Sequence, residues 1–459
     1  MSSAPLPVGC FFVVSARACL KATCIDVIVP HAIIRGMAAG LLLILLAACD
    51  PTAGAAPTPT PASSGTANGS VTLVLWHGWG GAERQALGRL VDRFNEQHPN
   101  GRVLLQPMPL ATMASDLRAA VAAGSGPHIV IIPNSWVGGL AEAGALRPLD
   151  DMVAQPDQDA PLPSTIGGAR APDRDGVTHL YGLPINFDTL ALYYNTANIL
   201  TPPDDTAKLL ETARGLSSPN AAPPLWGLAL NLSLDNTIGY LYAFGGRVFD
   251  DDGKLALGAA GREGAEKWLN WLLKLNNDLQ LRARVGSGIA VDREIKYGKV
   301  LMTFDWAHQI GTYRSLWGKD LGVSPLPRLS ETGQTPRPYI KSDLLAINAR
   351  AGLAERAAAA EFLHFMISTE AQGELLRSDI QPARRDLKLD GTAPYLVAAR
   401  AFRDQAEQGI PMPNSPTRGV VDEELRIMLE RVLTKQAGAT DAVTDADGRI
   451  REKLNLSGQ

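Results

Sequence analysis

The stretch Val71-Thr-Leu-Val-Leu-Trp-His-Gly-Trp-Gly-Gly81 indicates the fold, because five strand-type residues run directly into two tryptophans and three glycines. The pattern predicts a strand that ends in an exposed aromatic turn. Residues 82–97 follow with apolar side chains three and four positions apart, which is typical of an amphipathic helix. A strand, a loop and a helix open an α/β sheet, and ligands bind such sheets outside the carboxyl ends of the strands. We therefore expect Trp76, His77 and Trp79 at a ligand site.

The same alternation continues along the chain. Residues 101–107 predict a second strand and residues 111–124 a second helix. The apolar run at residues 128–133 is typical of a buried parallel strand, and it brings Asn134 and Trp136 to the same sheet edge. Alternating strands and helices indicate an α/β lobe with a largely parallel sheet.

Length, charge and cysteine positions limit the possible classes of protein. A chain of 459 residues with 46% hydrophobic composition is too long for one ordinary domain, so we expect two globular lobes. The formal net charge of −4, without a basic patch, argues against a nucleic-acid partner. All four cysteines, Cys10, Cys19, Cys24 and Cys49, precede the globular part. The body of the protein therefore has no disulfide, thiolate nucleophile or cysteine-ligated metal.

The amino-terminal region has the features of an export signal. Residues 37–48 form an apolar run that is shorter than the ~18–20 residues needed to span a bilayer, which indicates a signal-peptide core. Leu46-Ala-Ala-Cys49 resembles the lipobox of bacterial lipoproteins, in which the cysteine is acylated; a generic secretory cleavage site is the alternative. We expect residues 1–48 to be a signal peptide. Residues 49–70, rich in Pro, Thr, Ser and Ala, would be a lipidated tether that holds the protein on the outer side of the cytoplasmic membrane, in the periplasm or at the cell surface.

A set of segments in the body of the chain resembles family 1 extracellular solute-binding proteins, the maltose-binding-protein-like substrate receptors of ABC importers. Their order and spacing, more than any single motif, carry the resemblance, which extends from residue 71 to the end. The segments are Trp76-His-Gly-Trp-Gly-Gly81, Gly124-Ser-Gly-Pro-His-Ile-Val-Ile-Ile132, Trp136-Val-Gly-Gly-Leu-Ala-Glu-Ala-Gly-Ala-Leu-Arg-Pro-Leu-Asp150, and Tyr181-Gly-Leu-Pro-Ile185 leading to Leu192-Tyr-Tyr-Asn195.

The resemblance implies an α/β, two-lobed, periplasmic-binding-protein-like (type II) fold with a hinge and an interlobe ligand cleft. Lobe 1 would comprise residues 71–186 plus 339–387, and lobe 2 residues 187–338 plus 388–459. The chain would cross between the lobes at residues 181–195, and the tail after residue 412 would pack on lobe 2. The family commonly has a glycine-rich start where Tyr339-Ile-Lys-Ser-Asp343 stands, so the contribution of that loop is an open question.

Two predictions concern the secondary structure of lobe 2. Residues 226–234 alternate like a strand and residues 236–244 predict the helix that follows. Residues 298–306 predict another strand, whose end presents Trp306 at the position where the resembled family brings a tryptophan to the cleft.

The candidate ligand-binding residues match the chemistry of a sugar, which offers hydroxyls at its edge and C–H patches on its faces. Indole rings supply flat walls, and Asp, Asn and His supply hydrogen bonds at the edge. The predicted walls are Trp79, Trp136 and Trp306, the predicted edge partners are His77, Asn134, Asn186 and Asp188, and Trp76 lies in the same turn. Core packing is the alternative for each tryptophan, and it is our prediction for Trp268 and Trp271, which have core spacing in a helix.

Other functions stay open at this point. A secreted carbohydrate-active hydrolase would need two cleft carboxylates, Asp188 with Asp305 or Asp235. An iron-binding receptor would use Tyr193-Tyr194, and a purely structural envelope lipoprotein would bind nothing. No phosphate-binding loop, hydrolase elbow or histidine pair at metal spacing is present. We predict a monomeric receptor, not an enzyme and without cofactor or metal, that captures a small solute, above all a sugar, and delivers it to the transmembrane subunits of an ABC-type permease.

Overall fold

The computed structural model describes residues 16–20, 23–27, 70–250, 254–284 and 289–456. The chain divides into two units, residues 1–60 and 61–459. In the first unit, β1 (Ala16–Leu20) pairs with β2 (Thr23–Val27) in antiparallel register. The predicted signal-peptide core, Cys49 and most of the tether lie outside the described residues. Within the described part of the chain, no helix is both long enough and apolar enough to cross a membrane.

The second unit contains two five-stranded sheets, and lobe 1 is built on the sheet with strand order β4-β3-β5-β16-β8. Strand β3 is parallel to β4 and β5, whereas β16 is antiparallel to β5 and β8. The strands are β3 (Val71–His77), β4 (Gly101–Pro107), β5 (Ile129–Pro133), β8 (Leu183–Pro184) and β16 (Asp343–Ile347). The helices of this lobe are α2 (Gly81–Gln97), α3 (Leu110–Ala122), α4 (Val137–Glu142), α5 (Gln155–Asp159), α6 (Pro163–Ile166), α12 (Leu353–Met366) and α13 (Thr369–Arg377). Shorter elements are β6 (Arg170–Pro172), β7 (Thr178–Leu180) and the 3-10 turns Asn134–Trp136 and Gly167–Ala169.

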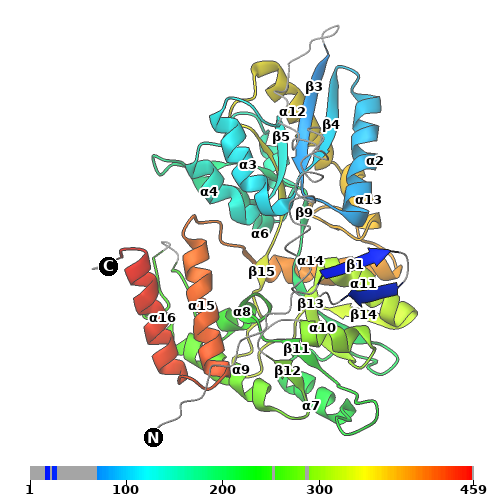
Figure 1. Ribbon diagram of the computed structural model, residues 1–459, viewed down its shortest axis with the longest axis vertical. Coiled ribbons are helices and arrows are strands. Elements are labelled where there is room, and N and C mark those ends of the chain that lie inside the picture. The colour runs from blue at the N-terminus through cyan, green and yellow to red at the C-terminus, as the bar shows by residue number, and fades with distance from the viewer. Residues whose placement is uncertain (1–15, 21–22, 28–69, 251–253, 285–288, 457–459) are drawn as a thin grey trace, which may run out of the picture. The chain divides into compact units, whose positions relative to one another are not determined.

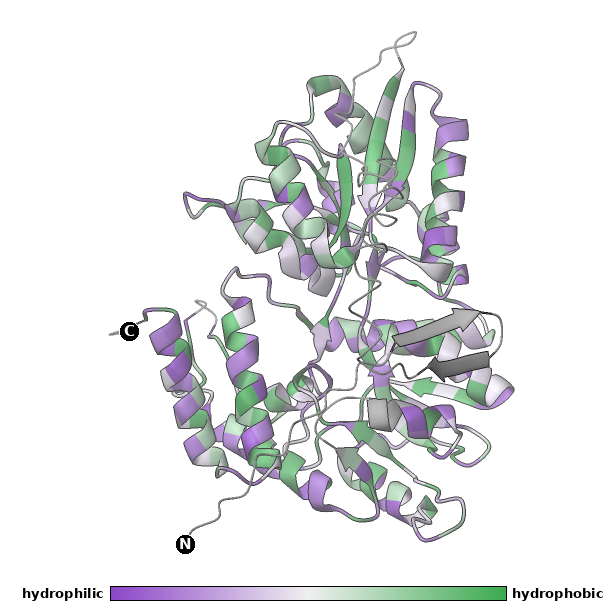
Figure 2. Ribbon diagram, viewed as in Figure 1, coloured by the Kyte–Doolittle hydropathy of each residue, from purple (hydrophilic) through white to green (hydrophobic). Residues whose placement is uncertain are grey.

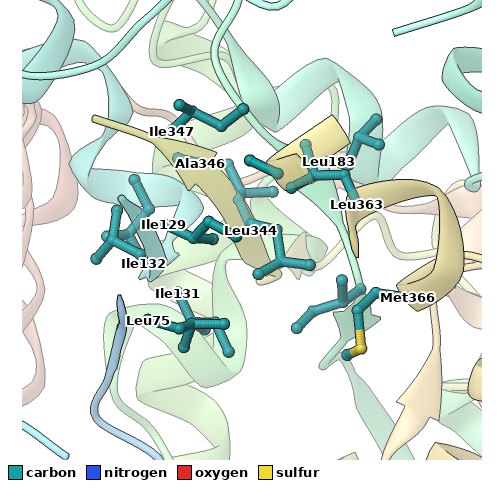
Figure 3. Close-up of a cluster of buried hydrophobic side chains, with 14 of the residues drawn as sticks. Leu75, Ile129, Ile131, Ile132, Leu183, Leu344, Ala346, Ile347, Leu363 and Met366 are labelled. Atoms are coloured by element: carbon teal, nitrogen blue, oxygen red, sulfur yellow. The ribbon is translucent and has the colours of Figure 1, made fainter. Parts of the chain in front are cut away.

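The core of lobe 1 surrounds the central strands β5 and β16. Ile129, Ile132, Leu344 and Leu345 are fully buried, and Figure 3 shows the surrounding apolar side chains, which include Leu183 and Met366. Strand β5 is hydrophobic along its length, whereas α2 alternates between apolar and polar faces (Figure 2). Burying each such aliphatic side chain contributes about 1.5–3 kcal/mol. The apolar run and the amphipathic helix are therefore placed as the sequence predicts.

Lobe 2 is built on the sheet with strand order β12-β11-β13-β10-β14. Strand β11 is parallel to β12 and β13, and β10 is antiparallel to β13 and β14. The strands are β10 (Leu190–Asn195), β11 (Ala229–Asn231), β12 (Arg282–Arg284), β13 (Met302–Trp306) and β14 (Leu321–Ser324). The helices are α7 (Thr206–Leu216), α8 (Leu234–Ala243), α9 (Arg262–Asn277), α10 (Ile289–Lys296), α11 (Ile310–Trp317), α14 (Pro394–Gln408), α15 (Arg418–Leu433) and α16 (Ala439–Lys453), with 3-10 turns at Ala307–Gln309 and Gly318–Asp320.

The tail of the chain packs on lobe 2, as predicted. Helices α15 and α16 lie side by side and both contact α9 (Figure 1). Trp268 and Trp271 of α9 are buried in this core, which confirms the prediction that they pack in the core.

The predicted strand at 226–234 is too long, because only Ala229–Asn231 forms β11. The side chain of Asn231 accepts a hydrogen bond from the Ser233 backbone N–H, and this local turn ends the strand before α8 begins.

The two lobes are joined by paired crossing segments that form a hinge. Strand β9 (Asn186–Phe187) pairs with β17 (Gln381–Pro382), and β15 (Tyr339–Ile340) pairs with β18 (Ile410–Pro411). Asp188 and Lys341 exchange backbone hydrogen bonds of 2.8 and 3.0 Å. The prediction of a two-lobed α/β fold with a hinge is confirmed, while the lobe bounds given by the sequence stay a prediction.

Candidate functional site: the interlobe cleft

A cavity of about 750 Å³ lies between the two lobes. Lobe 1 contributes residues of the α2 amino terminus and of the turn after β5, and lobe 2 contributes residues of α8 and of the turn after β13. The hinge segments at 186–188, 341–343 and 378–381 line the cavity between them. The size is within the ~300–1,000 Å³ usual for small-molecule sites.

On the lobe 1 side, three strand ends meet at one edge of the sheet. The parallel strands β3 and β5 end there, and the antiparallel strand β16 begins there because Asp343 stands opposite Pro133. Helix α2 begins directly after β3, at Gly81, whose φ of +49° favours glycine. Glu83 in the first turn of α2 therefore faces the cavity.

Asp343 is held at this edge by hydrogen bonds to Trp79 and Asn186. Its Oδ2 accepts hydrogen bonds from Trp79 Nε1 (2.8 Å) and Asn186 Nδ2 (2.9 Å), and its backbone N–H donates to Asn186 Oδ1 (2.7 Å). Burial raises the pKa of Asp343, although these two side-chain donors lower it. Burial also raises the pKa of Glu83, and the neighbouring charge of Asp343 raises it further.

On the lobe 2 side, carboxylates are paired with cationic groups. His308 Nδ1 lies 2.7 Å from Asp188 Oδ2, and this hydrogen bond raises the pKa of His308. Lys341 Nζ lies 3.2 Å from Asp235 Oδ2 and 3.5 Å from the ring centroid of Trp306, so its ammonium is shared between a carboxylate and an aromatic face.

A bidentate ion pair connects the lobes beside the cleft. Arg314 Nη1 and Nη2 on α11 donate to Asp379 Oδ2 (2.6 Å) and Oδ1 (2.8 Å), and Asp379 follows α13 of lobe 1. Asp379 has a φ of +64°, a region that Asp enters more readily than most residues. The pair therefore joins helix α11 of lobe 2 to the segment that follows helix α13 of lobe 1.

Several buried polar atoms of the cleft have no hydrogen-bond partner among the described residues. They include Asn134 Nδ2, Asp235 Oδ1, Ser342 Oγ and Gln381 Oε1, and both Ser342 and Gln381 are 5% exposed. Leaving such atoms without partners costs about 1–3 kcal/mol each.

The structure brings three of the predicted site residues together in the cleft. Asn134, Asn186 and Asp188 all line it. Trp136 lines an adjoining cavity of about 420 Å³, together with arginines of α3 and α15. Ser135 and Arg418 line both cavities, so the second adjoins the first at these residues.

The other four predicted residues lie behind the walls of the cleft. Trp76, His77 and Trp79 are buried within lobe 1, and Trp306 is buried within lobe 2. Burial also lowers the pKa of His77, so its imidazole is neutral near pH 7. Trp79 holds Asp343, and Trp306 donates to Asn236 Oδ1 (3.2 Å) while Lys341 covers its ring. The indole rings thus support polar groups that face the cleft.

Several cleft residues were not predicted from the sequence. Lys341, Ser342 and Asp343 come from the loop whose contribution was an open question, and Glu83 comes from the first turn of α2. Their signal is positional: each stands next to a strand end that reaches the cleft edge. His308 follows β13 in the same way.

Most of the residues considered above for iron binding and for hydrolysis have hydrogen-bond partners within the protein. No group of three or more His, Cys, Asp or Glu residues that could hold a metal occurs among the described residues. The Tyr193 hydroxyl donates to the Trp306 carbonyl (2.8 Å), within the interior of lobe 2. Asp305 accepts a hydrogen bond from the Tyr313 hydroxyl (2.7 Å). The carboxylates considered for hydrolysis are therefore engaged by partners within the protein.

Two sheets joined by a paired-strand hinge, with a cavity between them, define the chain as a two-lobed binding protein of type II. A family model described as bacterial extracellular solute-binding protein matches residues 89–393. The match covers more than half of the chain, and the chain belongs to this family of extracellular solute-binding proteins. The family acts outside the cytoplasm, which agrees with the predicted export.

Two curated relatives extend the comparison. The chain is 25% identical over 358 residues to the maltotriose-binding protein of Pyrococcus abyssi (strain GE5 / Orsay), covering 77% of this chain and 75% of that protein. It is 24% identical over 422 residues to the galactooligosaccharide-binding protein of Bacillus subtilis (strain 168), covering 89% and 94%. Among solved structures, the cyclic alpha-maltosyl-1,6-maltose binding protein of Arthrobacter globiformis matches with a TM-score of 0.72 at 19% identity, covering 85% of this chain and 100% of that one, which shows the shared fold.

Proposed function

We propose that the protein is a sugar-binding receptor that captures its ligand in the interlobe cleft and delivers it to an ABC-type permease. The observation that carries the proposal is the cleft itself, in which Ser342 Oγ and Gln381 Oε1 are buried without partners among the described residues. Sugar hydroxyls both donate and accept hydrogen bonds, so they match such atoms. The two relatives are named for binding maltotriose and galactooligosaccharide, which supports this class of solute.

Closure of the lobes on the ligand is the proposed mechanism of capture. One lobe presents only part of the cavity wall, and the hinge segments line the rest. Hinge rotation of two lobes around a ligand is an established type of transition. Asn134 would bind from lobe 1, Asp188 from the hinge, and Trp136 would contact the part of a longer sugar that enters the adjoining cavity.

The proposal also includes three features that follow from the sequence. We propose acylation of Cys49, with residues 49–70 as a tether on the outer side of the cytoplasmic membrane, and a monomeric receptor without catalytic activity. Replacing Cys49 by Ser should release the protein from the membrane fraction. Retention of the C49S protein in that fraction would contradict the lipid anchor.

Binding of maltotriose tests the sugar-binding function directly. We expect a rise in melting temperature that increases with ligand concentration, because a ligand at 100 times its Kd stabilises by about 2.7 kcal/mol. Solution scattering should show a smaller radius of gyration with ligand. Ser342→Ala should weaken binding about 2- to 12-fold, the value of one neutral hydrogen bond.

Ser115→Ala is the matched control, because Ser115 is an exposed serine of α3 away from the cleft. This variant should bind like the wild type. If maltotriose and a library of neutral and charged oligosaccharides all leave the melting temperature unchanged, the sugar-binding proposal is wrong.

A further inference from the structure

The cleft contains more acidic groups than its cations neutralise. Three of the carboxylates that line it, Asp188, Asp235 and Asp379, are paired with His308, Lys341 and Arg314 respectively. The remaining cation of the lining, Arg418, is paired with Asp422 at 2.9 Å. This leaves Glu83 and Asp343, for which the described residues provide no ion pair.

These two unpaired carboxylates belong to the same wall and influence each other. Both stand at the cleft edge of the lobe 1 sheet, Glu83 after β3 and Asp343 at the start of β16. The charge of Asp343 raises the pKa of Glu83. Asp343 is held by two neutral donors, Trp79 and Asn186, which fix its position without cancelling its charge.

A second observation at the same cavity points to a donor-bearing ligand. The side chain of Gln381 is 5% exposed, and its Oε1, which only accepts hydrogen bonds, has no partner among the described residues. Asp235 Oδ1, also in the cavity wall, is without a partner in the same part of the chain. Besides these two acceptors, the lining contains the donor Asn134 Nδ2 and the Ser342 hydroxyl without partners in the described part of the chain. These atoms match the hydroxyls of a sugar, which donate and accept, while the two unpaired carboxylates would repel an anionic solute.

Closure of the lobes makes the uncompensated charge costly. A carboxylate that loses water needs a hydrogen-bonded opposite charge, because isolated buried ions are strongly disfavoured. Neutral hydroxyls donate hydrogen bonds without cancelling the charge, whereas an ammonium does both. Lys341 shows the same arrangement within this cleft, since its ammonium lies between Asp235 and the face of Trp306.

We propose that the solute is an amino sugar whose protonated amine binds between Glu83 and Asp343. Its hydroxyls donate to Gln381 and exchange hydrogen bonds with Ser342. This inference rests on the proposed sugar-binding function and narrows it to one class of sugar, and it excludes sugars that carry phosphate or carboxylate groups at this position.

Calorimetric titration with four trisaccharides tests the inference. The probes are the glucosamine trimer, its N-acetylated counterpart, maltotriose and trigalacturonic acid, at about pH 6.5, where an amine of ordinary pKa near 7.7 is protonated. We expect the glucosamine trimer to bind at least tenfold more tightly than the N-acetylated trimer and the galacturonic acid trimer to bind least. Glu83→Gln should reduce the preference for the free amine about tenfold.

Glu96→Gln is the matched control, because Glu96 is an exposed residue at the other end of the same helix. Glu96→Gln should change neither the affinity for the glucosamine trimer nor the affinity for the N-acetylated trimer. Circular dichroism verifies that each variant is folded, and Asp343→Asn provides an independent second test of the amine preference.

The outcomes separate the two proposals. If maltotriose or the N-acetylated trimer binds as tightly as the glucosamine trimer, the amino-sugar inference is overturned while the sugar-binding function stands. If the amine preference survives in both Glu83→Gln and Asp343→Asn, the placement of the amine is wrong. If none of the four trisaccharides binds and the wider oligosaccharide screen is also negative, the sugar-binding function fails, and this inference fails with it.

Discussion

The two walls of the cleft hold their carboxylates in different ways. On the lobe 1 wall, Asp343 accepts hydrogen bonds from neutral donors, and neither it nor Glu83 has an ion pair among the described residues. On the facing wall, Asp188 and Asp235 are each paired with a cationic group. The ion pairs therefore compensate the carboxylates of the facing wall but not those of the lobe 1 wall, and we expect lobe 1 to determine the preference for ligand charge.

Trp79 and Trp306, which are buried behind the two walls, show the same difference. Trp79 donates its indole N–H to the Asp343 carboxylate (2.8 Å), whereas Trp306 donates to the neutral amide of Asn236 (3.2 Å) and stacks its face against Lys341. The indole of Trp79 therefore contacts the carboxylate of Asp343, and the indole of Trp306 contacts the ammonium of Lys341. Aromatic residues at the strand ends thus position the polar groups of the site.

Replacing these tryptophans should have the largest effect on the free energy of unfolding. Trp79→Phe removes a donor to a carboxylate, and we expect a loss of about 1.5–3 kcal/mol in the free energy of unfolding, beyond the loss of ring volume. Trp306→Phe removes a hydrogen bond between neutral groups, and we expect about 0.5–1.5 kcal/mol beyond the same volume effect. Urea denaturation measures both losses.

A double-mutant cycle separates the hydrogen bond from the packing. In an Asp343→Asn background, Trp79→Phe should cost less, because the charge that strengthened the bond is absent. Equal losses for the two tryptophans, together with no coupling between Trp79 and Asp343, would show that the walls do not differ in the way described above.

The ion pair that joins the walls should have a smaller effect on stability. The side chains of Arg314 and Asp379 are 42% and 33% exposed, so solvent screens their attraction. We expect Arg314→Gln to lower the free energy of unfolding by less than about 1 kcal/mol. Because the pair connects different lobes, we also expect a larger radius of gyration for the unliganded variant in solution scattering.

Arg93→Gln is the control for this ion pair. Arg93 is paired with Glu370 at 3.1 Å and comparable exposure, but both residues belong to lobe 1. The control should show a similar small change in stability and an unchanged radius of gyration. If both variants scatter alike, the Arg314–Asp379 pair does not restrain the lobes.

The sequence predicts the local elements of this fold well, because their signals are local. The apolar run of β5 and the spacing of α2 each lie within one short segment. The extent of β11 is predicted less well, because a side-chain turn at Asn231 interrupts an alternating pattern that would otherwise continue.

The roles of the tryptophans could not be predicted from the sequence in the same way. An aromatic residue after a strand fits a ligand wall and a buried support equally well. The partner that decides between them for Trp79 is Asp343, 264 positions away in the chain. The pairing of β16 with β5 brings this residue to the cleft edge, and no local pattern records that pairing. The same holds for Trp306, whose ring is covered by Lys341.

The smallest expected effect concerns pH. The contributions of the two walls to the free energy of unfolding should depend on pH in different ways. The hydrogen bond to Asp188 raises the pKa of His308 above its ordinary value of 6.5, and burial raises the pKa of Asp343 above 3.8. In both cases the folded protein binds the proton more tightly than the unfolded chain does. Each contribution to stability is therefore fully present below the unfolded pKa and is lost as pH rises through the folded pKa.

The two contributions should disappear in different pH windows, which distinguishes the walls. Relative to Asp343→Asn, the wild type should begin to lose stability above about pH 3.8; relative to His308→Gln, it should begin to do so only above about pH 6.5. The His308 effect should be the weaker one, because its side chain is 55% exposed and solvent screens the pair. Denaturant unfolding of the wild type and both variants across this pH range measures the differences. A His308 contribution that increases with pH would mean that the imidazole is neutral in the folded protein, and the lobe 2 wall would then carry uncompensated charge like the lobe 1 wall.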